Sequence, residues 1–132
     1  MRILIADDHV VIRAQVRCLL EAEHWEVCGE AVNGHDALEK VRQLKPDLVI
    51  LDMNMPVLSG YDVALEIRRV SPLTRILILS MYEQANLPSI LEETKADAYV
   101  TKSRTISDLI STIKELLSTV STAVAADRKS VV

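Results

Sequence analysis

Five short apolar runs recur along the chain, at residues 3–6, 25–31, 48–51, 76–79 and 98–101. They are rich in Leu or in β-branched residues, and the first, third and fourth are continuously apolar. A continuous apolar run is typical of a strand that is covered on both faces, as in a parallel sheet. The pattern therefore predicts five β-strands with protein packed on both sides.

Between and after these runs, apolar residues recur at intervals of three and four, the spacing of one face of an α-helix. The stripes lie at residues 12–20, 37–44, 63–70, 87–91 and 106–117, and the last is the most regular. Asn33-Gly34 precedes the second stripe and Ser59 precedes the third, where each favours a helix start. Pro88 limits where the fourth helix begins, so that helix is expected to be short or labile.

The alternation of strands and helices, repeated five times, predicts an α/β fold with a parallel sheet between two layers of helices. Right-handed crossovers restrict the topology, and the flavodoxin-like, doubly wound strand order 2-1-3-4-5 suits five strands best. We expect one domain over residues 1–117 with five helices. Residues 118–132 are rich in Ser, Thr, Ala and Val, and are predicted to be a fraying helix end followed by a tail or linker.

The composition is that of an ordinary folded protein. Of the 132 residues, 49% are hydrophobic and 26% charged, and the core must be aliphatic because the chain has no Phe. No apolar run approaches the ~20 residues needed to cross a bilayer, and the chain turns acidic at Asp7, too early for a signal peptide. We therefore expect a cytoplasmic protein without membrane contacts.

The charge and the cysteines exclude further classes of function. The net charge is −4, which argues against direct binding of this chain to nucleic acid, because such binding depends on Lys and Arg. Cys18 and Cys28 have neither metal-ligand spacing nor a disulfide-rich context. They are expected to be reduced, buried thiols that pack as small apolar side chains.

Polar residues follow the predicted strands. The first strand runs into Asp7-Asp8, the third into Asp52, the fourth into Ser80 and the fifth into Lys102. Because the carboxyl ends of parallel strands meet at one edge of the sheet, where ligands bind in open α/β folds, these side chains are expected to converge. Three carboxylates, a hydroxyl and an ammonium group then share one site.

Three neighbouring carboxylates repel one another and favour a bound cation. The ligands are hard oxygens, which points to Mg²⁺ or Mn²⁺. Such a site suits phosphoryl transfer, which depends on positioning and charge neutralisation. Asp52 is the natural acceptor, forming an aspartyl phosphate, because its strand is central and its carboxylate lies at the strand's tip.

At this point the residues resemble a known family. The segment DMNMPVLSG at residues 52–60 resembles the acceptor loop of CheY-like receiver domains of two-component response regulators, with the acceptor Asp, the Met-Pro and the Gly in register. Asp7-Asp8 resembles the acidic pair of that family, Ser80 its switch hydroxyl and Lys102 its lysine. Each motif is weak alone, but the ordered set is specific and covers nearly the whole chain.

The resemblance implies a metal site. Asp8 and Asp52 would ligate Mg²⁺ directly, the main-chain carbonyl of Asn54 would be a third ligand, and Asp7 would act mainly through water. Asn54 also stands two positions after the acceptor, where it is expected to slow the release of phosphate.

The resemblance also implies a switch and its partners. Ser80 would move to bond the phosphoryl group, Lys102 would pair with it, and Tyr99 would change rotamer. The phosphodonor would be a phosphohistidine on a sensor histidine kinase, and the target a downstream protein or a fused output domain. Asp8-His9 resembles regulators of the LuxR/NarL type, whose output is a DNA-binding helix-turn-helix, so transcription regulation is expected if the chain is part of a longer regulator.

The regular apolar stripe at 106–117 is compatible with a homodimer, through that helix together with either the first helix or the fourth helix and fifth strand. The length of the chain leaves two architectures open. One is a stand-alone receiver that acts through partners, and the other is a fragment of a longer regulator.

Two rival functions come from other classes. A metal-dependent phosphohydrolase with an aspartyl nucleophile would need an acid two positions after it, and Asn54 stands there. A receiver-like interaction module that is never phosphorylated would not need the acidic set. We therefore expect a phosphoacceptor switch that is not an enzyme and that at most removes its own phosphate slowly. Simpler roles exist for single residues. Asp7-Asp8 could be a helix cap and turn. His9 lies near the acidic pair and could tune it, but a capping or solvated residue is expected there.

Three positions depart from the family pattern. Ser103 follows the lysine, where many receivers have Pro. Met81 and Tyr82 follow the switch serine, where the family usually has a smaller or polar residue at one or the other place. Both side chains are bulky, so we expect them to restrict access of water and small phosphodonors to Asp52.

Replacement of Tyr82 tests this expectation. Tyr82→Ala should open the access route and speed autodephosphorylation severalfold, measured as the loss of label from the phosphorylated protein over time. A rate in the mutant equal to or slower than that of the parent would reject the role of Tyr82.

Overall fold

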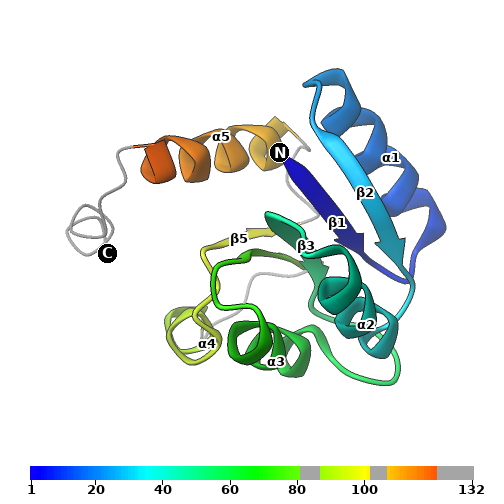
Figure 1. The fold of residues 1–132 in the computed structure, drawn as a ribbon, viewed down its shortest axis with the longest axis vertical. Helices are drawn as coiled ribbons and strands as arrows, with labels where there is room; N and C mark the ends of the chain where they lie inside the picture. Colours follow the sequence, from blue (N-terminus) through cyan, green and yellow to red (C-terminus); the bar gives the residue numbers. More distant parts are fainter. Residues whose placement is uncertain (81–86, 102–106, 122–132) are drawn as a thin grey trace.

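A computed structural model describes residues 1–80, 87–101 and 107–121, and its centre is one parallel β-sheet (Figure 1). The strands are β1 (Arg2–Ala6), β2 (Glu26–Ala31), β3 (Leu48–Asp52), β4 (Arg75–Ser80) and β5 (Ala98–Thr101). They lie in the order β2-β1-β3-β4-β5, which confirms the predicted flavodoxin-like topology. β3 is therefore central, between β1 and β4.

The described residues form five helices, which cover the sheet on both faces. They are α1 (Val10–Ala22), α2 (Gly34–Leu44), α3 (Gly60–Val70), α4 (Leu87–Thr94) and α5 (Ser107–Ser121). α1 and α5 pack on one face, and α2, α3 and α4 on the other (Figure 1). The predicted doubly wound architecture is confirmed. Within the described ranges, no helix is long and apolar enough to cross a membrane.

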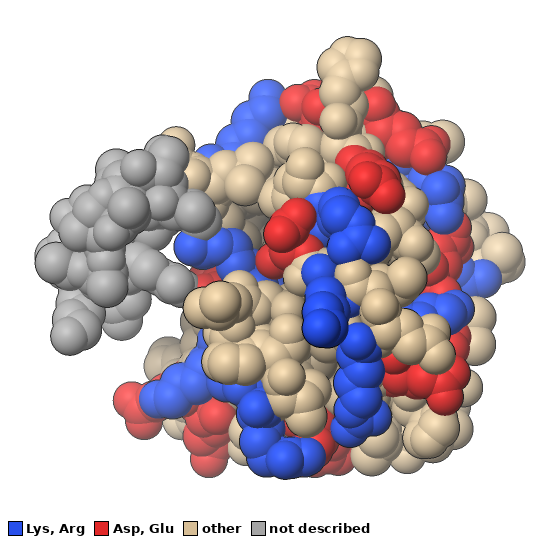
Figure 2. Space-filling view, viewed as in Figure 1, with Lys and Arg blue, Asp and Glu red and all other residues tan. Residues whose placement is uncertain are grey.

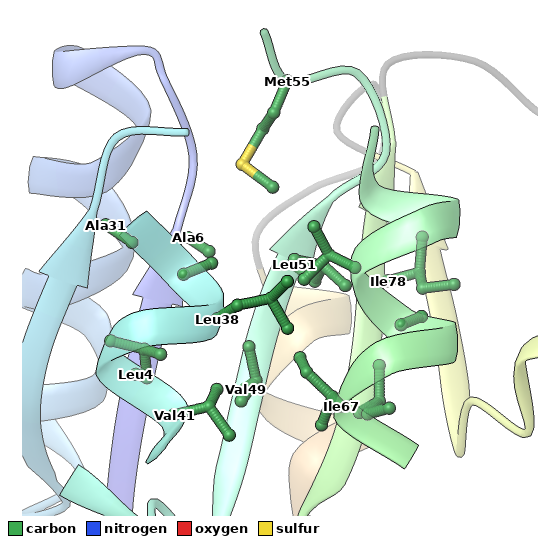
Figure 3. Packing of buried hydrophobic residues seen from close by; sticks show 14 of the residues in the cluster. Leu4, Ala6, Ala31, Leu38, Val41, Val49, Leu51, Met55, Ile67 and Ile78 are labelled. Carbon is green, nitrogen blue, oxygen red and sulfur yellow. The ribbon is translucent and has the colours of Figure 1, made fainter. Parts of the chain in front are cut away.

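The continuous apolar runs are explained by the two layers of helices. Consecutive side chains of a strand point to opposite faces. Ile3 and Ile5 of β1 pack with residues of α1 and α5, whereas Leu4 and Ala6 pack with residues of α2 and α3. Figure 3 shows the second cluster, in which Leu38 reaches from α2 toward the sheet. Because both faces are covered, both must be apolar.

Local signals set the helix ends as predicted. The Asn33 side chain accepts a hydrogen bond from the Asp36 N–H at 2.8 Å at the start of α2. The Ser59 hydroxyl accepts one from the Asp62 N–H at 3.3 Å at the start of α3. Each satisfies one of the free donors of a helix N-terminus. α4, with Pro88 at its second residue, has only eight residues, which confirms the expected short fourth helix.

α5 continues to Ser121, so the first residues after Leu117 are helical, as the predicted helix end implies. The cysteines differ from the sequence prediction. Cys28 is only half-buried and Cys18 is exposed, so the prediction of two buried thiols is wrong. α1 buries Val16 and Leu20. Cys18 is two positions from each of them, so it lies on a different side of the helix and is exposed.

Burial in the sheet should make Leu77 far more important to stability than Leu73, four positions earlier. Leu77 on β4 is 0% exposed and Leu73 is 94% exposed. Leu77→Ala should lower the free energy of unfolding by about 2–5 kcal/mol, since it leaves a cavity in the core. Leu73→Ala, the matched control, should change it by less than about 0.5 kcal/mol. Urea denaturation measures both, and similar losses would contradict the packing described.

Candidate functional site

The carboxyl edge of the sheet brings three predicted acidic residues together. β1 lies beside β3, with Ala6 paired to Leu51. Asp7 therefore follows β1 next to Asp52, the last residue of β3. One oxygen each of Asp7, Asp8 and Asp52 and a ring nitrogen of His9 all lie within 4.8 Å of one another. The predicted convergence of the three carboxylates is observed.

The three carboxylates differ in their exposure to solvent. Asp7 and Asp52 are each only 1% exposed, because they lie at the ends of the two central strands, while Asp8 faces outward. The Asp7 Oδ1 atom accepts a hydrogen bond from the His9 N–H at 2.8 Å. The Asp52 Oδ1 atom accepts one from the Asn54 N–H at 3.2 Å. The main chain thus orients both buried carboxylates.

His9 contributes more to this site than the sequence indicated. It stands at the N-cap position of α1, but in the described structure its side chain makes no capping bond. Its Nδ1 atom instead lies 3.0 Å from Asp7 Oδ1 and 3.1 Å from Asp8 Oδ1, while the rest of the ring is largely exposed. The side chain therefore does not cap the helix. It is solvated, which was the other expected role, and it is in direct contact with the acidic pair.

The donor set fits a hard divalent cation. Three carboxylate oxygens gather at one point, two of them on nearly buried residues. Buried like charges are costly unless a cation or a proton compensates them. Carboxylate oxygens are the ligands that Mg²⁺ prefers. The described residues therefore fit Mg²⁺, with Asp7, Asp8 and Asp52 as the residues that would hold it.

The loop after β3 is fastened to the sheet by its own residues. Met53 and Met55 are buried in the core cluster on the side of α2 and α3, so they pack the loop onto the sheet. Val57 has a φ of +74°, a left-handed conformation that is strained for a β-branched residue. The loop thus holds a strained residue close to the acidic site.

Gly60, the first residue of α3, packs directly against the end of β3. Its N–H donates to the Met53 carbonyl at 2.8 Å. A Cβ atom at this position would collide with the Asp52 carbonyl oxygen and lie 2.7 Å from the Met53 Cα. Both are main-chain atoms that cannot move without displacing Asp52. Only glycine therefore permits this approach of α3 to the acidic site.

The remaining predicted site residues fall into two groups. Ser80 ends β4, is 0% exposed and pairs with Thr101 of β5. Tyr99 on the edge strand β5 is half-buried and packs against the α2 and α3 side of the core. Lys102, Met81, Tyr82 and Ser103 lie outside the described residues.

Arg13 is a residue that sequence reasoning missed. Its Nη1 atom donates to the main-chain carbonyl of Asp7 at 2.7 Å. A signal for it was present in principle, since an arginine in the first turn of the helix after an acidic pair lies near that pair. The direction of the Arg13 side chain, however, depends on its ion pair with Glu30 on β2.

Sequence comparison identifies relatives of known class. A family model described as the response regulator receiver domain matches residues 3–114. The chain is 40% identical over 115 residues to the transcriptional regulatory protein PdtaR of Mycobacterium tuberculosis. That match covers 86% of this chain and 55% of PdtaR, so the chain spans about half the length of this relative.

Comparison with solved structures finds relatives of the same class, the response regulators. A two-component response regulator of the LuxR family from Aurantimonas sp. SI85-9A1 superposes with a TM-score of 0.83 and 31% identity, over 89% of this chain and 84% of the other. The response regulator TrrA from Thermotoga maritima, in complex with Mg²⁺-BeF, superposes with a TM-score of 0.77 and 39% identity, over 87% of this chain and 97% of the other.

The close approach of Gly60 generates a test. Gly60→Ala should lower the free energy of unfolding by about 1–3 kcal/mol through overpacking, and should weaken Mg²⁺ binding because the end of β3 shifts. Gly29→Ala is a matched control, since its added Cβ would meet only side-chain atoms of Leu44 and Leu4. Denaturation and Mg²⁺ titration measure both effects. Equal Mg²⁺ affinity in the Gly60→Ala variant and the parent would contradict the argument.

Proposed function

The chain belongs to the response regulator receiver domain family of two-component systems, and we propose that Asp52 is the residue that accepts the phosphoryl group. The observation that carries the proposal is the gathering of Asp7, Asp8 and Asp52 within 4.8 Å at the carboxyl edge of the sheet. Asp52 is the member on the central strand. Its Oδ1 atom is oriented by the Asn54 N–H, so the carboxylate is held for reaction.

The proposed cation is Mg²⁺, with Mn²⁺ as a substitute. Asp8, Asp52 and the main-chain carbonyl of Asn54 are its proposed ligands, and Asp7 acts through water. When bound, the cation neutralises charge on the carboxylates and on the incoming phosphoryl oxygens. The complex of TrrA with Mg²⁺-BeF supports this choice for a relative of the same fold.

The proposed reaction is transfer from a phosphohistidine of a sensor histidine kinase. An oxygen of the Asp52 carboxylate attacks the phosphorus, a P–O bond forms and the P–N bond breaks. The imidazole nitrogen leaves with the electron pair of that bond. The chain thus gains an acyl phosphate on Asp52, and the kinase histidine returns to its unmodified form.

Exposed apolar side chains follow the acidic residues along the chain and are suited to contact the kinase. Val10 and Val11 at the start of α1 are 66% and 63% exposed, and Val57 in the loop after β3 is 75% exposed. Exposed apolar residues that surround a polar site are typical of a protein interface. We assign this rim to the docking of the phosphodonor domain.

The proposed switch begins at Ser80 and Lys102. The phosphoryl group adds negative charge and strong acceptor oxygens, which draw both side chains toward Asp52, and Tyr99 changes rotamer. α4 follows, because it has only eight residues. An exposed side-chain hydrogen bond, from Tyr61 Oη to Glu93 Oε1 at 2.9 Å, joins it to α3. The result is a population shift between two surface states.

The proposed readout face is α4, β5 and α5, and its target is a downstream protein or a fused output domain. Relatives of the chain are transcriptional regulators, so control of transcription is the proposed process. The proposed domain spans residues 1–117, and 118–132 is a tail or linker. A homodimer through α5, with α1 or with α4 and β5, is proposed as one way to transmit the signal.

Direct contact of this chain with nucleic acid or a membrane forms no part of the proposal. The net charge is −4, and on the face seen in Figure 2 basic and acidic side chains are intermingled. The proposed location is the cytoplasm, where a sensor kinase presents its phosphohistidine.

Receiver domains are phosphoacceptor switches and not classical enzymes. We propose slow self-dephosphorylation only, tuned by Asn54, Met81 and Tyr82. A phosphohydrolase would need a general acid at the position of Asn54. Sustained steady-state phosphatase activity would favour that alternative, and the absence of any Mg²⁺ binding would favour an interaction module that is never phosphorylated.

Labelling of Asp52 tests the central proposal. Asp52→Asn should abolish incorporation of phosphate from acetyl phosphate or a kinase, because an amide oxygen is a poor nucleophile. Asp47→Asn is the matched control, since Asp47 precedes the same strand at its opposite, exposed end, and it should label as the parent does. Intact-protein mass spectrometry measures both. Equal labelling of the Asp52→Asn variant and the parent would reject the assignment.

A further inference from the structure

Arg13 lies one helical turn beyond the acidic pair and turns its side chain back toward it. Its N–H bonds the His9 carbonyl at 3.0 Å in the first turn of α1. Its Nη1 atom donates to the main-chain carbonyl of Asp7 at 2.7 Å, and its Nε atom donates to Glu30 Oε1 at 2.9 Å. The side chain is only 13% exposed. One guanidinium group therefore links the loop after β1 to β2.

Glu30 holds this guanidinium group in place. It lies on β2 opposite Ile5 of β1, and its second carboxylate oxygen accepts a hydrogen bond from Arg17 Nε at 2.6 Å. Burial tends to raise the pKa of Glu30, but hydrogen bonds from Arg17 and Arg13 outweigh burial and the pKa is lowered. The carboxylate is therefore charged at neutral pH, and both its oxygens order an arginine.

Asp7 is held through its amide, its side chain and its carbonyl. Its N–H donates to the Ala31 carbonyl at 3.0 Å, its Oδ1 atom accepts from the His9 N–H at 2.8 Å, and its carbonyl accepts from Arg13. The first two bonds fix the amide and the side chain. The bond from Arg13 fixes the peptide plane that joins Asp7 to Asp8, and hence the direction in which Asp8 leaves the strand.

We propose that Arg13 is a positioning residue for the acidic pair, and that Glu30 orients Arg13 for this role. The inference rests on the proposed function, because it takes Asp7 and Asp8 to hold a divalent cation. Arg13 acts through the main chain of Asp7 and touches neither cation nor phosphoryl group. Groups that orient metal ligands typically change metal affinity when removed.

The chemistry of the side chain explains why an arginine stands here. The Nε and Nη atoms of a guanidinium group donate in fixed directions within one plane, so one side chain serves a carboxylate and a carbonyl at once. The single ammonium group of a lysine has no such fork. A lysine at position 13 keeps the charge but not the two-point geometry.

Arg17 provides a matched control on the same helix. It also donates to Glu30, but its Nη1 atom donates to Glu21 Oε2 at 3.2 Å and not to Asp7. Replacing Arg17 with Gln removes the same type of side chain and a bond to the same carboxylate. The bond from Arg13 to the Asp7 carbonyl remains.

The experiment compares Mg²⁺ affinity with thermal stability in three proteins. Isothermal titration with MgCl₂ and a thermal melt are run on the parent, Arg13→Gln and Arg17→Gln. Both variants should melt at a lower temperature, because each loses a bond to Glu30. The Kd for Mg²⁺ should rise about tenfold in Arg13→Gln and stay near the parent value in Arg17→Gln. An equal rise in both variants, or none in Arg13→Gln while the parent binds, overturns the inference.

A lysine variant separates geometry from charge and serves if Arg13→Gln does not fold. Arg13→Lys should bind Mg²⁺ as weakly as Arg13→Gln, since the fork is lost. Parent-like affinity in Arg13→Lys would show that charge alone matters and would overturn the positioning role. A parent protein that binds no Mg²⁺ and takes no label on Asp52 would overturn the proposed function itself. A parent and an Arg13→Gln variant that bind Mg²⁺ equally well would overturn only the role of Arg13.

Discussion

The gathering of three carboxylates at one edge of the sheet is the constraint on which the rest of the structure depends. Asp7 and Asp52 are almost completely buried and lie within 4.8 Å of Asp8. In a low-dielectric environment such charges repel one another strongly. Such charges are costly unless the surrounding hydrogen bonds, a proton or a positive charge compensates them. The fold can therefore be understood as a frame for this cluster.

The frame holds the cluster by close packing on one side and by hydrogen bonds on the other. α3 approaches the end of β3 so closely that position 60 admits only glycine, and Met53 and Met55 pack the connecting loop into the core. On the side of β1, the Asp7 carbonyl is held by Arg13, which is itself held by Glu30. Each buried carboxylate thus has its own support, drawn from a different layer of helices.

The same architecture separates the chemistry from the expected response. Asp7 and Asp8 lie directly after β1 and Asp52 is the last residue of β3, at the edge of the sheet between the two layers of helices. Ser80 and Tyr99 belong to β4 and β5, which lie on the other side of β3. Asp52 pairs with Leu79, the residue before Ser80, so a charge added at Asp52 lies beside the end of β4. The proposed switch begins at that point.

The sequence alone determined the strand order, the two helix layers, the starts of α2 and α3 and the convergence of the acidic residues. These follow from periodicity, from caps such as Asn33 and from the geometry of parallel strands, all of which are local or topological. Only the tertiary structure decided that His9 contacts the acidic pair, that Arg13 turns back to Asp7, that Cys18 faces outward and that residue 60 has no room for a Cβ. Those features depend on which atoms of separate elements come within a few ångströms, and no spacing along the chain encodes that distance.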